Sequence, residues 1–148
     1  MRIQRVEQNY PLDLLLLADP SEERIKSYLP KSQVFVLEEA GEAFGCYALQ
    51  KLTATQMEVM NIAVSEKRQG EGLGKILLNH AVQEAKKAGA RDLHVGTGNS
   101  SIGQVAFYQK MGFRLTAIKL DFFTENYEEP IFENGLLCRD MWCFSREI

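Results

Sequence analysis

Alternating and periodic apolar positions predict a succession of short strands and helices along the whole chain. β-Branched and aromatic runs predict strands over residues 1–8, 34–37, 43–51, 58–64, 93–95, 115–123 and 136–144. Helices are predicted over residues 12–18, 19–29, 73–88 and 101–111, most clearly over 73–88, where apolar residues recur three or four apart. Asp19 is expected to cap the second helix, and Gly89 and Gly112 to end the last two.

The order of these elements predicts an α/β domain. The fourth and fifth strands flank the long helix 73–88, an arrangement typical of a parallel strand pair. The rest of the sheet is expected to be mostly antiparallel, with a hairpin formed by the strands over residues 34–37 and 43–51. No repeat, linker or low-complexity segment interrupts the pattern, so a single domain is expected over residues 1–148.

Composition narrows the class of protein. The 148 residues are 45% hydrophobic and 25% charged, which excludes disordered, collagen-like and membrane classes. With 17 basic and 20 acidic residues, the net charge of −3 argues against a nucleic-acid partner. The N-terminus lacks the apolar stretch of a signal peptide, and no run is long enough to span a membrane. Three cysteines without C-x-x-C spacing argue against a disulfide framework or a zinc site, so a cytoplasmic location is expected.

A glycine-rich, basic segment between the fourth strand and the long helix is the main candidate for a ligand site. Gly70, Gly72 and Gly74 allow close approach of a ligand to the backbone, and the start of a helix favours anions. Lys67, Arg68 and Lys75 add positive charge, so a phosphate-bearing ligand is expected. The spacing G-x-G-x-G fits neither a Walker loop nor a dinucleotide-binding fingerprint.

Two motifs resemble those of one enzyme family. Gln69-Gly-Glu-Gly-Leu-Gly74 matches the Q/R-x-x-G-x-G/A motif of the GNAT superfamily of N-acetyltransferases, and Ala106-Phe-Tyr-Gln-Lys-Met-Gly-Phe113 resembles its second signature. The element order is also similar, so the chain is identified as a member of that superfamily. The segments 96–101 and 133–141 resemble a small branch of uncharacterised bacterial members. The resemblance implies a mixed, mostly antiparallel sheet with a parallel, splayed pair formed by strands four and five, and flanking helices.

The resemblance also implies acetyl-CoA as co-substrate and no metal. By family position, the backbone that binds the pyrophosphate is that of Gln69, Gly70, Glu71, Gly72, Leu73, Gly74 and Lys75. The pantetheine arm is expected along Ile62, Ala63 and Val64, with an N–H near Ile62 or Ala63 stabilising the oxyanion. The acetyl group then passes directly to a primary amine, expected on a small molecule, in a ternary complex.

Two residues fall at family positions for acid and base catalysis. Tyr108 matches the general acid that protonates the departing thiolate. Glu58 matches a general base found in some members, although a solvent-facing strand acid explains it equally well. Strict alternation along the strand predicts that Asn61 faces away from Glu58.

The second motif departs from the family pattern. Ser101 and Gln104 stand where many members carry asparagine and alanine, and an asparagine is found at Asn99 instead. Either Asn99 or Ser101 is therefore expected to contact the CoA arm, because both can hydrogen-bond an amide.

The segment 121–133 carries five acids and no lysine or arginine. Family position places this connection near the acceptor, where an acidic wall favours a cationic amine; a solvated acidic loop is the alternative. His80 and His94 are expected to pack in the structure and to bind no metal. A homodimer is plausible by family habit.

Two rivals to an enzyme stay open. One is a non-catalytic acyl-CoA-binding or sensing module that retains the glycine loop without turnover. The other is a nucleotide-binding domain, which would take ATP or NAD in place of CoA.

Overall fold

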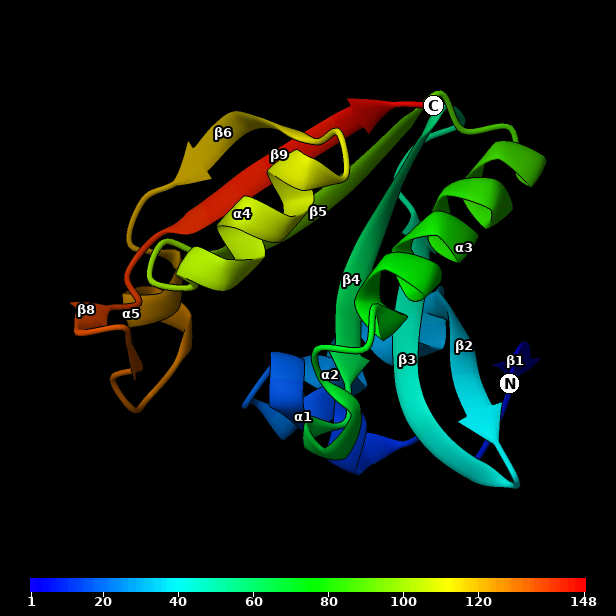
Figure 1. The fold of residues 1–148 in the computed structure, drawn as a ribbon. Helices are drawn as coiled ribbons and strands as arrows, with labels where there is room; N and C mark the ends of the chain where they lie inside the picture. The colour runs from blue at the N-terminus through cyan, green and yellow to red at the C-terminus, as the bar shows by residue number, and fades with distance from the viewer. The chain divides into compact units, whose positions relative to one another are not determined.

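Figure 1 shows the computed structural model, which describes residues 1–148. Two compact units make up the chain, one over residues 1–93 with Ile148 and one over residues 94–147. The strand order is β1-β2-β3-β4-β5-β9-β6, with β7 and β8 forming a separate two-stranded sheet. This mixed, mostly antiparallel arrangement with a parallel β4–β5 pair and flanking helices confirms the predicted fold class. No helix is long and apolar enough to cross a membrane.

The first unit is a four-stranded antiparallel sheet with its helices. The strands are β1 (Arg2–Val6), β2 (Ser32–Glu39), β3 (Glu42–Lys51) and β4 (Gln56–Val64). The helices are α1 (Leu12–Ala18), α2 (Glu22–Tyr28) and α3 (Leu73–Lys87), with short 3-10 turns η1 (Leu29–Lys31) and η2 (Glu66–Arg68). These bounds agree with the predicted elements to within a few residues.

Helices cover both faces of this sheet, which explains why β3 and β4 are apolar on both sides. Cys46 and Ala48 of β3 pack in one cluster with Leu15 and Ile25 from α1 and α2. On the opposite face, Leu77 of α3 lies so near Gly45 that a Cβ there would be only 2.8 Å from Leu77 Cδ1. Figure 1 shows α3 running beside β3 and β4. A strand enclosed on both faces is fixed in register, because any slip would move its apolar side chains.

A bulge in β4 corrects one sequence prediction. Ala48 of β3 pairs with Asn61, but the next residue, Leu49, pairs with Val59, so Met60 is the extra residue. Gln50 then pairs with Glu58. Directly paired residues share a face of the sheet, and residues 48 and 50 of β3 share a face as well. Glu58 and Asn61 therefore lie on the same face, and the prediction that they point in opposite directions was wrong.

Asn61 ties that face of β4 to the first two helices. Its Nδ2 group donates to the carbonyl of Leu15 and to the hydroxyl of Tyr28, both at 3.0 Å. The Tyr28 hydroxyl donates in turn to Asp19 Oδ2 at 3.2 Å. Asp19 thus serves this contact, and the cap of α2 is Ser21, whose hydroxyl accepts from Arg24 N. The predicted cap at Asp19 was two residues too early.

The second unit combines a three-stranded antiparallel part of the sheet with two helices and a hairpin. Its elements are β5 (Asp92–Gly98), α4 (Ile102–Lys110), β6 (Arg114–Lys119), α5 (Phe122–Asn126), β7 (Phe132–Glu133), β8 (Leu136–Leu137) and β9 (Met141–Glu147). The first two residues of β5 still belong to the first unit.

Two predicted strands are interrupted in this unit. The strand over residues 115–123 ends at Lys119, because Asp121 takes a left-handed conformation with φ 59° and α5 follows. The strand over residues 136–144 is divided into β8 and β9 by residues 138–140. The turn at Asn134–Gly135 is present as predicted and joins β7 to β8.

A histidine–tyrosine pair lies between the sheet and α3, with Tyr47 buried and His80 half-buried. The Tyr47 ring stacks on Phe35 with centroids 4.9 Å apart, and its hydroxyl lies 2.6 Å from His80 Nδ1. His80 Nε2 lies 3.8 Å from a carboxylate oxygen of Glu84. Burial lowers the pKa of His80 from its ordinary 6.5, although Glu84 acts in the opposite direction. A neutral imidazole accepts the Tyr47 hydroxyl at Nδ1 and keeps its proton at Nε2.

This pair should make part of the stability pH-dependent. The folded-state pKa of His80 is lower than the unfolded value, so the unfolded chain binds the extra proton first as pH falls below about 6.5. The stabilising contribution of neutral His80 is therefore complete above that pH and is lost in acid. Urea unfolding at pH 8 and pH 5 should show the stability advantage over a His80→Gln variant shrinking at pH 5. An advantage that is constant or larger at pH 5 would contradict this.

Candidate functional site

The glycine loop connects β4 to α3 through backbone conformations that favour glycine. Gly70 has φ 83° and Gly72 has φ 81°, both in the left-handed region. A Cβ built at either position would meet no atom within 4 Å, so neither glycine is required by crowding. Their positive φ angles set the path of the turn and leave its surface open.

The loop ends at a helix start that no side chain caps. Gly72 occupies the N-cap position of α3, and the first helical hydrogen bond runs from Ile76 N to Gly72 O at 3.2 Å. The N–H groups of Leu73, Gly74 and Lys75 precede it, and no acid lies in the first turn. N–H groups in this position, at the positive end of a 15-residue helix, are suited to bind an anion.

The end of β4 adjoins this loop. Ile62 and Ala63 are buried, and Val64 is half-buried. These three residues pair with Tyr47, Cys46 and Gly45 of β3, which fixes their backbone. Gln69 Nε2 donates to the Val64 carbonyl at 3.2 Å and so joins the loop to the strand end. The structure therefore brings together residues 62–64 and 69–75.

Fewer positive charges are available to a ligand at the loop than the number of basic residues in the sequence suggests. Arg68 Nε lies 2.9 and 2.8 Å from the two carboxylate oxygens of Glu71, and its Nη1 lies 3.1 Å from Glu39 Oε2. The hydrogen bonds with Glu71, which have the larger effect, and with Glu39 raise the pKa of Arg68. The charge of Arg68 is thus balanced within the protein. Lys67 and Lys75 are exposed and are the cations that a ligand can meet at the loop.

Tyr108 lies on α4 in the second unit and is 3% exposed. Its ring contacts Phe113 and Phe144, with centroids 6.1 and 5.9 Å apart. Burial raises the pKa of Tyr108, so its phenol is protonated and able to donate across the usual pH range.

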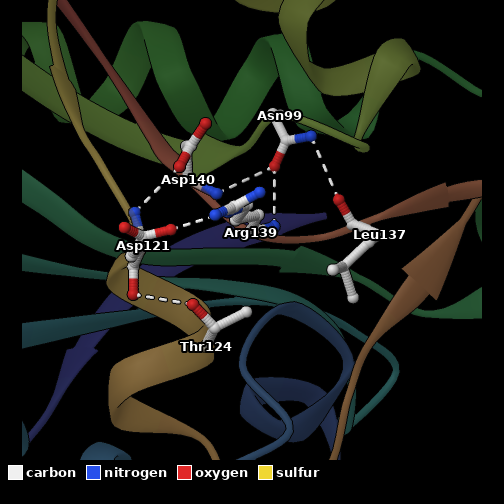
Figure 2. Close-up of polar contacts among 6 residues, drawn as sticks. All are labelled: Asn99, Asp121, Thr124, Leu137, Arg139 and Asp140. Atoms are coloured by element: carbon white, nitrogen blue, oxygen red, sulfur yellow. Dashed lines mark hydrogen bonds and ion pairs between the residues drawn. The ribbon is translucent and has the colours of Figure 1, made fainter.

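The Asn99 side chain makes three hydrogen bonds within the second unit (Figure 2). Its Oδ1 atom accepts the main-chain N–H of Arg139 at 2.8 Å and of Asp140 at 2.9 Å. Its Nδ2 group donates to the carbonyl of Leu137 at 3.1 Å. Asn99 therefore holds the segment between β8 and β9 in place.

The same segment is fixed to the start of α5. Arg139 Nε lies 2.6 Å from Asp121 Oδ1, and Asp140 Oδ1 accepts the N–H of Asp121 at 2.8 Å. The Thr124 hydroxyl donates to the Asp121 carbonyl at 3.1 Å (Figure 2). These contacts explain the left-handed conformation of Asp121 and the break in the predicted strand.

Ser101 also has a partner in the protein. Its hydroxyl donates to Glu133 Oε1 at 2.9 Å, and the Ser100 hydroxyl lies 3.5 Å from the same oxygen. Two of the five acids predicted to form an acidic wall, Asp121 and Glu133, are thus engaged in local contacts. Glu125, Glu128 and Glu129 are exposed.

The predicted site residues are divided between the two units. Glu58, residues 62–64 and the glycine loop lie in the first unit, and Asn99, Ser101 and Tyr108 in the second. Glu39 was missed, because nothing in its local sequence links it to Arg68. The pairing of Arg68 with Glu71 had a signal, the three-residue spacing of opposite charges. No group of three or more His, Cys, Asp or Glu side chains is arranged to hold a metal ion.

Comparison with known proteins gives a consistent result. The family model for an acetyltransferase (GNAT) domain matches residues 30–115. The uncharacterized N-acetyltransferase YvbK of Bacillus subtilis is 49% identical over 129 residues, which cover 87% of this chain and 83% of that protein.

Two solved structures are similar over nearly their whole length. An IAA acetyltransferase from Bacillus cereus has a TM-score of 0.96 and 48% identity, covering 99% of both chains. A GNAT family acetyltransferase from Elizabethkingia anophelis, solved with acetyl-CoA bound, has a TM-score of 0.97 and 44% identity, covering 99% of this chain and 97% of the other.

Replacing Asn99 should loosen the segment that it holds. An Asn99→Ala variant leaves the N–H groups of Arg139 and Asp140 without their acceptor, at an expected cost of about 1–3 kcal/mol in the free energy of unfolding. Urea unfolding measures the cost, and hydrogen exchange should become faster at these two amides. Asn126→Ala is the control, because Asn126 makes a single exposed contact to Phe122 O within α5. Equal effects of the two variants would contradict the role of Asn99.

Proposed function

Because the chain belongs to the GNAT family of acetyltransferases, we propose that it transfers the acetyl group of acetyl-CoA directly to the primary amine of a small molecule. The acetyl-CoA complex of the E. anophelis neighbour supports the choice of donor. All three cysteines are free, which is consistent with a reducing, cytoplasmic location.

The observation that carries this proposal is the uncapped start of α3 behind two left-handed glycines. The N–H groups of this turn and the helix dipole suit the pyrophosphate, and the open surface over Gly70 and Gly72 leaves room for it. Exposed Lys67 and Lys75 add the positive charge that the phosphates require. The residues present therefore fit the proposed co-substrate.

The end of β4 is proposed to hold the pantetheine arm through the backbone of residues 62–64. An N–H group of Ile62 or Ala63 would donate to the thioester oxygen and stabilise the negative charge that forms there. The rigid pairing of these residues with β3 supports this role, because a donor that does not move costs no reorganisation during the reaction.

Glu58 and Tyr108 are proposed as base and acid. The amine nitrogen bonds to the thioester carbon, and the carbon–sulfur bond breaks. Glu58 accepts the proton that the amine loses, and the Tyr108 phenol donates its proton to the departing sulfur. The protonated state of Tyr108 supports its role as the donor. Asn99 and Ser101 are given no role at the CoA arm, since each already has partners in the second unit.

The exposed acids Glu125, Glu128 and Glu129 favour a cationic acceptor over an anionic one. The test measures CoA-thiol release with polyamines, aminoglycosides, neutral and acidic amino acids, and IAA, included because of the B. cereus neighbour. Turnover fastest with a cationic amine is expected. Binding of acetyl-CoA without turnover on any amine would instead identify a binding module, and a thermal shift with ATP or NAD but not CoA would identify a nucleotide-binding domain.

Replacing the acid should slow turnover. A Tyr108→Phe variant retains the ring packing and loses the proton donor, so kcat should fall about 100-fold while the Kd for acetyl-CoA changes little. Steady-state kinetics and calorimetry measure the two quantities. Tyr10→Phe is the control, because the exposed Tyr10 hydroxyl contacts only the Glu7 carbonyl, at 3.2 Å. An unchanged kcat in Tyr108→Phe would remove Tyr108 from the mechanism.

Replacing the base should give a defect that depends on pH. A Glu58→Gln variant cannot accept the amine proton, so kcat/KM should fall roughly 10- to 100-fold at pH 7. The defect should shrink toward pH 9.5, where more of the amine is already deprotonated. The rate profile between pH 6.5 and 9.5 measures this, with exposed Glu42→Gln as control. A defect of the same size at every pH would show that Glu58 is not the base.

A further inference from the structure

Arg68 and Glu71 form an ion pair at the edge of the proposed pyrophosphate site. Arg68 closes the turn η2 and is two residues before Gly70, whereas Glu71 lies between the left-handed Gly70 and Gly72. The two Nε–oxygen distances of 2.9 and 2.8 Å show that one N–H is shared by both oxygens of Glu71. This pair joins the residue just before the loop to the centre of the loop.

Two further contacts hold the guanidinium in this position. Its Nη1 group donates to Glu39 Oε2 at the end of β2, and its central carbon lies 4.5 Å from the centre of the Phe44 ring of β3. The Arg68 side chain is 23% exposed, whereas each of its carboxylate partners is 45% exposed. Arg68 is therefore fixed by the sheet, and Glu71 is fixed by Arg68.

The position of Glu71 raises an electrostatic problem for an anion site. Its carboxylate belongs to the loop whose N–H groups would bind two phosphates, and like charges at short distance repel strongly where water is partly excluded. Compensation by Arg68 removes most of this repulsion. Lys67 and Lys75, exposed and without an ion pair in the protein, provide the attraction.

We propose that Arg68 is a positioning residue that neutralises Glu71 and fixes the conformation of the glycine loop, and that it does not itself bind the phosphates. This inference rests on the proposed function, because it concerns binding of acetyl-CoA. Arg68 and Glu39 lie outside the glycine motif, and in this proposal they hold the loop in the conformation that binds the phosphates.

The test is a double-mutant cycle on the Kd for acetyl-CoA, measured by calorimetry. Arg68→Gln removes the positive charge, keeps an aliphatic stem over Phe44 and leaves Glu71 uncompensated, so the Kd should rise roughly tenfold. Glu71→Gln in the same chain should restore the Kd to within about threefold of the wild type. Arg68→Lys, which retains the charge, should also bind to within about threefold.

Arg2→Gln is the matched control. Arg2 of β1 forms an exposed ion pair, at 2.9 Å, with Glu38 of β2, which is next to Glu39 in sequence. Arg2→Gln therefore changes the net charge of the protein by the same amount as Arg68→Gln. Its Kd for acetyl-CoA should stay within about twofold of the wild type, because the ion pair of Arg2 is with Glu38 and not with a loop residue, and exposed charges are screened by salt. A tenfold loss in Arg2→Gln would show that net charge alone sets binding, and would overturn the proposal.

An acetyl donor without phosphates distinguishes an electrostatic effect of Arg68 on phosphate binding from an effect of Arg68 on folding. S-Acetylpantetheine lacks the pyrophosphate, so its kcat/KM should be nearly the same in the wild type and in Arg68→Gln, while that of acetyl-CoA falls. Equal losses with both donors would mean that Arg68 only stabilises the fold.

Two other outcomes are decisive. If the Arg68→Gln/Glu71→Gln double variant binds as weakly as Arg68→Gln, Arg68 contacts the phosphates itself and the proposal fails. If the wild type does not bind acetyl-CoA, the proposed function itself fails. If the wild type binds acetyl-CoA and Arg68→Gln binds it equally well, only the proposal for Arg68 fails.

Discussion

The enclosure of β4 on both faces constrains most of the first unit. Helices α1 and α2 cover one face and α3 covers the other, so β3 and β4 have one register that satisfies both cores. The bulge at Met60 is accommodated within that register and turns Glu58 and Asn61 to the same face. Asn61 then anchors α1 and α2 through Leu15 and Tyr28. Without the extra residue, strict alternation would place Glu58 and Asn61 on opposite faces.

The same strand sets the position of the glycine loop. Because Ile62 and Ala63 are buried and paired with β3, the chain leaves the sheet at a fixed point. Gln69 is bonded back to Val64, and Arg68 is held by Glu39 of β2. The loop therefore starts from a rigid base even though its own surface is open. A preorganised anion site needs this combination, since its N–H groups must already converge before the ligand arrives.

Apolar patterns and helix-start signals were sufficient to predict α1 to α4 and most strands, because each buries an apolar face, but they did not predict α5. The failures share a different cause. Alternation cannot reveal the Met60 bulge, which depends on pairing with β3. The break of the predicted strand after Lys119 depends on Arg139 and Asp140, about twenty residues further along the chain. The role of Glu39 depends on a contact with Arg68, 29 residues distant. Long-range polar contacts leave no periodic signal in the sequence.

Residue type did not predict what two polar residues beside the motifs contact in the structure. Asn99 and Arg68 are both suited to bind a ligand, and residue type alone suggests that they do. In the structure each instead satisfies backbone or carboxylate groups of its own unit. A donor already bonded to a protein partner gains less from a ligand, because the exchange only replaces one hydrogen bond with another. Binding energy in this chain should therefore come from groups that folding leaves unpaired, which at the loop are the N–H groups of α3 and the two exposed lysines.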